Sequence, residues 1–173
     1  MTDLYKKSGY LNSEFKIFYL TESTSAKIDY HYHDFHKLLI FLNGSVAYSV
    51  EGREYELLPG DILLIRAGEI HRPIIRETVP YKRIIIYISD AFFASYQKEN
   101  CNLFYCYEEA RRFRLDRVQR LLVQILLWKP YDQLGAGEIV SVLNFISHRP
   151  VPPSYSRSVM NFHPSAVRTA ALP

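Results

Sequence analysis

Two histidines one residue apart, His31 and His33, stand shortly before an apolar run that ends at Asn43-Gly44. A third histidine, His71, follows a second stretch that contains glycines. Three imidazoles can together hold a divalent metal ion such as zinc. Four residues after His33, where a further metal ligand is expected, the chain has Lys37. These residue types therefore suit either a metal centre or a pocket for an organic ligand.

The positive charge of Lys37 opposes metal binding at these histidines. In an extended segment His31, His33 and Lys37 share parity and point to one face, so the ammonium would lie near a bound ion. Two unit charges about 4 Å apart repel by about 4 kcal/mol at an effective dielectric constant of 20, and a divalent ion doubles this energy. Three imidazoles can nevertheless hold zinc alone, if the lysine is displaced or deprotonated.

The same residues suit an organic ligand. A carboxylate or sugar acid would find cationic donors at Lys37 and Arg66. A neutral sugar would find imidazole donors and aromatic faces such as Tyr48 or Phe41. Both ligand classes stay open at this point.

Plainer interpretations exist for each residue. Lys37 could form a surface salt bridge with Asp34 or Glu51, because lysines are rarely buried unless they are paired. Each histidine could be an ordinary hydrogen-bonding residue of the fold. His36 has the opposite parity to His33, and we expect it to face outward and to play no special part.

The elements that must position these residues are short strands. Turn signals divide residues 15–89 into segments rich in apolar and β-branched residues, with no intervening helix. Such regular spacing is typical of an antiparallel sandwich or barrel. The predicted strands are 15–20, 37–42, 45–50, 53–58, 61–66, 71–76 and 82–89.

Two details of these strands can be tested. Asn43-Gly44 predicts a tight hairpin between its flanking strands, in which both central residues have positive φ. Alternation in the next strand places Val46, Tyr48 and Val50 on one face.

Helices follow the strands. We expect one helix over 90–97, with Asp90 as its N-cap, one over 114–128 and one over 135–148. The second has a broad apolar stripe that either packs on the barrel or forms a dimer seam, with nearby arginines along its polar side. The stripe is formed by Val118, Leu121, Ile125 and Trp128, with Leu115 and Leu122 beside it, and the arginines are Arg111, Arg112, Arg114, Arg117 and Arg120.

Composition excludes several classes of protein. Hydrophobic residues make up 48% of the chain, which is typical of a globular protein. No apolar run is long enough to span a bilayer, and the N-terminus has no signal-peptide pattern, so we expect a cytoplasmic protein without a membrane partner. Cys101 and Cys106 fit a reducing compartment. The net charge is +3, and we interpret the basic excess of residues 91–173 as helix surface and a basic tail.

Two motifs carry a resemblance to a known family. His31-x-His33-x3-Lys37-x6-Gly44 resembles the first cupin motif, with lysine at the usual glutamate position. Gly60-x5-Arg66-x-Gly68-x2-His71 resembles the second, with arginine at the usual proline position. More narrowly, residues 15–148 resemble the N-terminal effector-binding cupin domain of AraC-type (AraC/XylS) transcription regulators, without the C-terminal helix-turn-helix domain that binds DNA.

The resemblance implies a mainly β fold, a jelly-roll-like antiparallel cupin β-barrel followed by two or more α-helices. We expect an N-terminal arm (1–14), the barrel (15–89), a helical dimerisation and linker segment (90–148) and an irregular tail (149–173).

The implied function is to sense a small molecule and to dimerise, not to catalyse a reaction. The effector, a sugar or a carboxylate, would bind inside the barrel, without a cofactor. A homodimer would form through the C-terminal helices, and this chain alone would not bind DNA. The alternatives are a metal-dependent cupin enzyme, an isomerase or dioxygenase with its metal at the three histidines, and a dimerisation module without a ligand. The expected ligand-binding residues are His31, His33, Lys37, Tyr48, Arg66 and His71.

Overall fold

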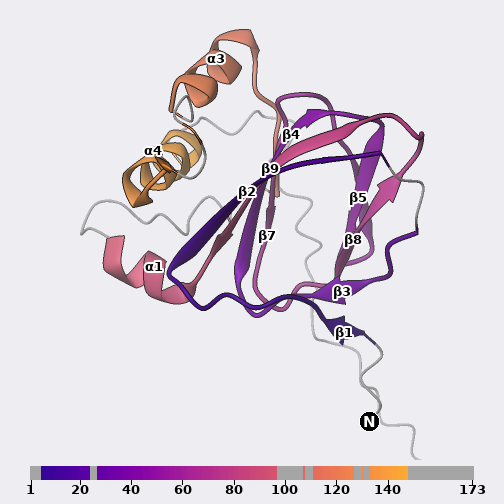
Figure 1. Ribbon diagram of the computed structural model, residues 1–173, viewed down its shortest axis with the longest axis horizontal. Helices are drawn as coiled ribbons and strands as arrows, with labels where there is room; N and C mark the ends of the chain where they lie inside the picture. Colours follow the sequence, from indigo (N-terminus) through magenta and orange to yellow (C-terminus); the bar gives the residue numbers. More distant parts are fainter. Residues whose placement is uncertain are drawn as a thin grey trace, which may run out of the picture.

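A computed structural model describes residues 5–23, 27–96, 107, 111–126, 130 and 133–147. Two five-stranded sheets face each other and form the barrel, and helices gather on the outer side of one sheet (Figure 1). We call the sheet with strand order β1-β3-β8-β5-β6 the open sheet, and the sheet with order β10-β7-β4-β9-β2 the covered sheet. The fold is mainly β and of the jelly-roll type, followed by helices, as the sequence predicts.

The strands are β1 (Lys6–Lys7), β2 (Phe15–Glu22), β3 (His31–Tyr32), β4 (His36–Asn43), β5 (Val46–Val50), β6 (Arg53–Glu56), β7 (Ile62–Ile65), β8 (His71–Ile75), β9 (Tyr81–Ile88) and β10 (Arg112–Phe113). The helices are α1 (Asp90–Tyr96), α3 (Arg117–Leu126) and α4 (Ala136–Ser147). The seven predicted strands and three predicted helices all have counterparts, whereas the two-residue strands β1, β3 and β10 were not predicted.

Strand β4 is apolar without alternation because its sheet is buried on both faces. Leu39 and Phe41 point into the core between the sheets. Leu38 and Ile40 point the other way, into a second core that α1, α3 and α4 cover. In β5 the inner positions are Val46, Tyr48 and Val50, as the alternation predicts.

The predicted hairpin at Asn43-Gly44 is wrong. β4 pairs with β7 and β9, whereas β5 pairs with β6 and β8, so this turn joins strands of different sheets. Gly44 has φ 134°. The side-chain amide of Asn43 donates to the Pro80 carbonyl at 2.9 Å. The tight hairpin instead joins β5 to β6 through Glu51-Gly52, whose φ values are 47° and 74°.

The N-cap of α1 is Ser89 and not Asp90. The Ser89 hydroxyl accepts the Phe92 N–H at 3.2 Å, the bond that an N-cap side chain makes to the third helical residue. Asp90 is the first helical residue, where a carboxylate suits the positive end of the helix dipole. Its Oδ1 lies 2.8 Å from Nε2 of His36.

Helix α3 begins at Arg117, three residues later than predicted. Asp116 accepts the Gln119 N–H at 2.8 Å, and the Gln119 side chain accepts the Asp116 N–H at 2.9 Å. This reciprocal pair is a capping box and fixes where the helix starts.

Three of the arginines predicted along the helix instead bind the barrel. The side chain of Arg112 donates to the Glu56 carbonyl at 2.8 Å, and that of Arg114 donates to Asp61 at 3.0 and 3.1 Å. Arg111 binds Glu69 with both terminal nitrogens. Side chains therefore fasten the segment before α3 to the end of β6 and to the loops on either side of β7.

The apolar stripe of α3 divides between the core and the surface. Leu115 and Val123 are buried in the core beneath the helices. Val118, Leu121 and Leu122 are 65%, 51% and 43% exposed. Packing on the barrel therefore does not account for the outer half of the stripe.

Some predictions lie outside the described residues: the tail 149–173, Cys101 and Cys106, and the side chains of Ile125 and Trp128. Within the described part of the chain, no helix combines the length and the apolar character that crossing a membrane requires.

Candidate functional site

The three motif histidines meet at the end of the barrel where β3 pairs with β8. His31 and His71 are direct partners in this antiparallel pair. His33 follows β3, and one ring nitrogen from each of the three histidines lies within 4.8 Å of the others. We call these residues the histidine cluster.

Hydrogen bonds to backbone carbonyls fix the tautomer of each ring. The Nδ1 partners are the carbonyls of Asp29 for His31 (2.9 Å), Ser8 for His33 and Glu69 for His71 (2.9 Å). A carbonyl can only accept, so each Nδ1 carries the hydrogen and each neutral ring keeps a lone pair on Nε2. The Nε2 atoms of His33 and His71 are buried and have no hydrogen-bond partner among the described residues. The cluster therefore presents acceptors, and not the imidazole donors expected for a neutral sugar.

Burial keeps the cluster uncharged. Removal from water, followed by the nearby charge of Lys37, lowers the pKa of His71 to about 2. Burial also lowers the pKa of His33 to about 4, against the opposing hydrogen bond to Ser8, and it lowers the pKa of His31. At neutral pH all three rings are therefore in the form that binds metals or accepts hydrogen bonds.

Lys37 is buried beside the cluster, with 4% of its surface exposed. Its Nζ donates to the Tyr48 hydroxyl at 3.4 Å and lies 5.4 Å from the centre of that ring. The proposed surface salt bridge is wrong: Asp34 pairs with Lys7, and Glu51 accepts a backbone N–H of the loop between β7 and β8. No carboxylate in the described part of the chain pairs with Lys37.

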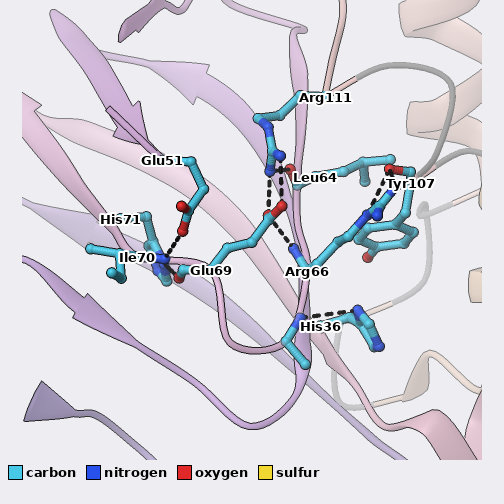
Figure 2. A network of polar contacts seen from close by, with 10 residues as sticks. His36, Glu51, Leu64, Arg66, Glu69, Ile70, His71, Tyr107 and Arg111 are labelled. Atoms are coloured by element: carbon cyan, nitrogen blue, oxygen red, sulfur yellow. Dashed lines mark hydrogen bonds and ion pairs between the residues drawn. The ribbon is translucent and has the colours of Figure 1, made fainter. Parts of the chain in front are cut away.

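Arg66 lies apart from the other predicted site residues. Its Nε and Nη2 donate to the Tyr107 carbonyl at 3.0 and 2.7 Å, and Figure 2 shows its side chain pointing toward Tyr107, away from His71. The structure thus brings together five of the six residues, namely His31, His33, Lys37, Tyr48 and His71.

The loop between β7 and β8, residues 66–70, holds His71 in place through a polar network (Figure 2). The Glu69 carboxylate accepts Arg111 Nη2 at 2.6 Å and the Arg66 N–H at 2.7 Å. Burial alone would raise the pKa of Glu69, but these hydrogen bonds outweigh it and lower the pKa. Further bonds join the loop to the barrel: Ala67 N–H to His36 Nδ1 (3.2 Å), Gly68 N–H to the His33 carbonyl (2.7 Å) and Ile70 N–H to Glu51 (2.6 Å).

His36 points away from the histidine cluster, as its parity predicts, but it is not on the surface. Only 4% of it is exposed, because its ring packs against Phe93 and Tyr107 beneath α1. The expectation of an ordinary outward-facing residue did not allow for a helix that covers this face of the sheet.

Two aromatic residues beside the cluster were missed. Phe35 stacks on His33 with ring centres 4.7 Å apart. Tyr87 lies opposite Lys37 in the β4–β9 register, and its ring centre is 5.6 Å from that of His33. Alternation in β9 puts Tyr87 on the inner face, but only the strand pairing places it next to the histidines.

Comparison with solved structures finds, among others, two cupin proteins and a lyase, each similar over less than half of this chain. A cupin 2 conserved barrel protein from Salinispora arenicola is 15% identical, with a TM-score of 0.41, over 47% of this chain and 68% of its own. A cupin superfamily protein from Desulfitobacterium hafniense is 17% identical, with a TM-score of 0.41, over 47% and 72%. A DMSP lyase from Ruegeria pomeroyi is 18% identical, with a TM-score of 0.41, over 44% and 39%. No curated protein matches the sequence.

The family model of the AraC-like ligand-binding domain matches residues 17–134. The matched segment contains both histidine motifs, every strand from β3 to β10, most of β2, and α3. Because it covers well over half of the 173 residues, this chain belongs to the AraC-like ligand-binding domain family.

Proposed function

We propose that this chain is the ligand-sensing and dimerising domain of an AraC-type transcription regulator, and that a sugar or carboxylate binds at the histidine end of the barrel. Its role is regulatory rather than catalytic, and it acts in the cytoplasm. The observation that carries this proposal is the buried Lys37 ammonium, which faces three neutral imidazoles and has no carboxylate partner in the described part of the chain. A buried charge without a counter-ion is costly, and an anionic ligand would remove that cost.

Hydrogen-bonding roles favour one kind of ligand within this proposal. The Lys37 ammonium is a donor and pairs best with a carboxylate. The Nε2 atoms of His33 and His71 are acceptors without partners among the described residues, and they pair with hydroxyl groups. A sugar acid, which has a carboxylate and several hydroxyls, would satisfy both sets of groups.

A thermal-shift comparison tests this assignment. We expect D-glucuronate to raise the melting temperature in a concentration-dependent way, because a ligand that binds only the folded chain stabilises it by RT ln(1 + [L]/Kd). D-glucose and acetate, which each lack one of the two kinds of group, should have smaller effects. In a Lys37→Met variant the preference for glucuronate over glucose should vanish. An unchanged preference in that variant would reject Lys37 as the counter-ion.

A metal-dependent cupin enzyme is the second candidate, and the ring tautomers favour it. Each Nδ1 of the cluster donates to a backbone carbonyl, which is the usual outer-shell support of a metal-binding histidine. The three rings therefore fit a divalent ion, whereas the Lys37 ammonium opposes one. Zinc, iron or manganese at one ion per chain in the purified protein, lost in a His31→Ala variant, would favour this candidate over the sensor.

We also propose that dimerisation uses the exposed half of α3. Val118, Leu121 and Leu122 are large apolar residues on one helix, and such residues gain stability when a partner covers them. A Val118→Glu variant should therefore sediment as a monomer at concentrations where the wild-type chain is a dimer. Tyr10→Glu, at a 79% exposed residue far from α3 in sequence, is the control and should leave the dimer intact. A Val118→Glu chain that stays dimeric would exclude this surface.

The N-terminal arm, the barrel and the helical segment that the sequence predicts each have a role in this proposal. The arm (1–14) supplies the Ser8 carbonyl to His33, and β1 pairs with β3 beside His31. The helical segment (90–148) follows the barrel (15–89) and carries α3. Ligand binding would shift one of these segments only if the ligand prefers one of its positions.

A further inference from the structure

A cavity of about 310 Å³ lies outside the barrel, between α3 and the covered sheet. Its walls are mostly apolar: Ile40 and Leu42 come from β4, and Leu115, Leu121 and Val123 from α3 and the residues before it. The volume falls within the range of small-molecule pockets, which begins at about 300 Å³. The histidine cluster takes no part in its lining.

Two guanidinium groups accompany this apolar lining. Arg117 and Arg120, both exposed residues of α3, line the cavity, and none of its lining residues is acidic. Arg117 makes no ion pair within the described part of the chain. Asp116, next to it in the sequence, is engaged in the capping box with Gln119. The cavity therefore combines an apolar interior with positive charge.

Arg120 is held at the cavity by the turn before β7. Its Nη1 donates to the Pro59 carbonyl at 3.0 Å, and a guanidinium has five N–H donors, so this bond uses only one of them. Its stem lies across Gly60, where an added Cβ would come within 2.0 Å of the Arg120 Cδ. Gly60 also has φ +93°, which other residues rarely adopt. The absence of a side chain at position 60 thus makes room for the arginine.

We propose that this cavity binds an amphipathic anion, a molecule with an apolar body and a single carboxylate head. The apolar body would lie against β4 and Val123, and the carboxylate would pair with Arg117 and Arg120, because planar guanidinium groups match carboxylates in geometry and charge. This ligand differs from the polar one proposed for the barrel. The cavity borders the exposed stripe of α3 at Leu121, so its occupant touches the proposed dimer surface.

Calorimetric titration with two probes of equal chain length, octanoate and 1-octanol, tests the proposal. Octanoate should bind the wild-type chain more tightly than octanol. Arg117→Gln should weaken octanoate binding about tenfold, because it removes a hydrogen bond to a charged group. It should leave octanol binding unchanged. Arg117 is an exposed residue. An Arg117→Lys variant, which keeps the positive charge, should bind octanoate more tightly than Arg117→Gln and less tightly than the wild-type chain.

A Lys37→Met variant separates this cavity from the barrel site. It should bind octanoate as the wild-type chain does, whatever its response to glucuronate. If Lys37→Met abolishes octanoate binding and Arg117→Gln does not, the anion binds in the barrel and the proposal is overturned. It is also overturned if octanoate does not bind the wild-type chain, or if Arg117→Gln weakens octanol and octanoate equally.

Discussion

A Lys37→Glu variant is expected to bind a divalent metal ion at least about a thousandfold more tightly than the wild-type chain. The ammonium that opposes a cation is replaced by a carboxylate that can ligate it. The three rings are already neutral and are held by their Nδ1 hydrogen bonds. Removing the repulsion alone is worth up to about 8 kcal/mol for a divalent ion some 4 Å away at an effective dielectric constant of 20, so a thousandfold gain is a conservative figure.

The measurement is a competition titration with cobalt or zinc against a chelator of known affinity. Lys37→Met is the matched control, because it removes the charge without adding a ligand and should lie between the wild-type chain and Lys37→Glu. Adding His71→Asn to Lys37→Glu should abolish the gain, since it removes a ligand. Equal affinities for the wild-type chain and Lys37→Glu would show that Lys37 is not what keeps a metal out.

The local pattern of the sequence predicts most of the strands, because turn residues and apolar segments are local signals. Strand pairing is not local. Asn43-Gly44 is the strongest hairpin signal by composition, yet it joins β4 to a strand of the opposite sheet. The two-residue strands β1, β3 and β10 exist only through contacts with distant segments, and their own residues give no sign of them.

The candidate site was predictable where side-chain alternation applies. His31, His33 and Lys37 share parity, and they do meet. Arg66 follows Ile65, whose side chain points between the sheets, so alternation turns Arg66 outward to the Tyr107 carbonyl. The tautomers were not predictable, because the carbonyls that fix them depend on folding; that of Ser8 is 25 residues away from His33.

The second large expected effect is a loss of stability as the pH falls from 6.5 to 5. Unfolded histidines have a pKa near 6.5, whereas burial and Lys37 hold the pKa of His71 at about 2. Within this range the unfolded chain takes up a proton that folded His71 does not, so protonation favours unfolding. Because the unfolded histidine is only half protonated at pH 6.5, His71 contributes a loss of about 1.7 kcal/mol over the range. His33 adds to this in the same direction, because its folded pKa is about 4.

Urea denaturation in the presence of a chelator measures this effect, and the choice of pH range isolates the histidines. The pKa of Glu69 is lowered from 4.5 and that of Asp34 from 3.8, so these carboxylates contribute their own losses mainly below pH 5. A His71→Asn variant removes one titrating group, so the slope of unfolding free energy against pH should fall, by about 0.7 kcal/mol per pH unit at pH 6.5 and by about 1.4 near pH 5.

His31→Asn is the graded control for this slope. His31 belongs to the same cluster and its pKa is also lowered, but it is only half-buried and feels a smaller desolvation penalty. Its replacement should therefore flatten the slope less than that of His71. If both variants keep the wild-type slope, the cluster is hydrated in solution and its rings titrate normally. A buried, neutral cluster beside Lys37 then could not be the basis of ligand recognition, so this measurement also bears on the proposed site.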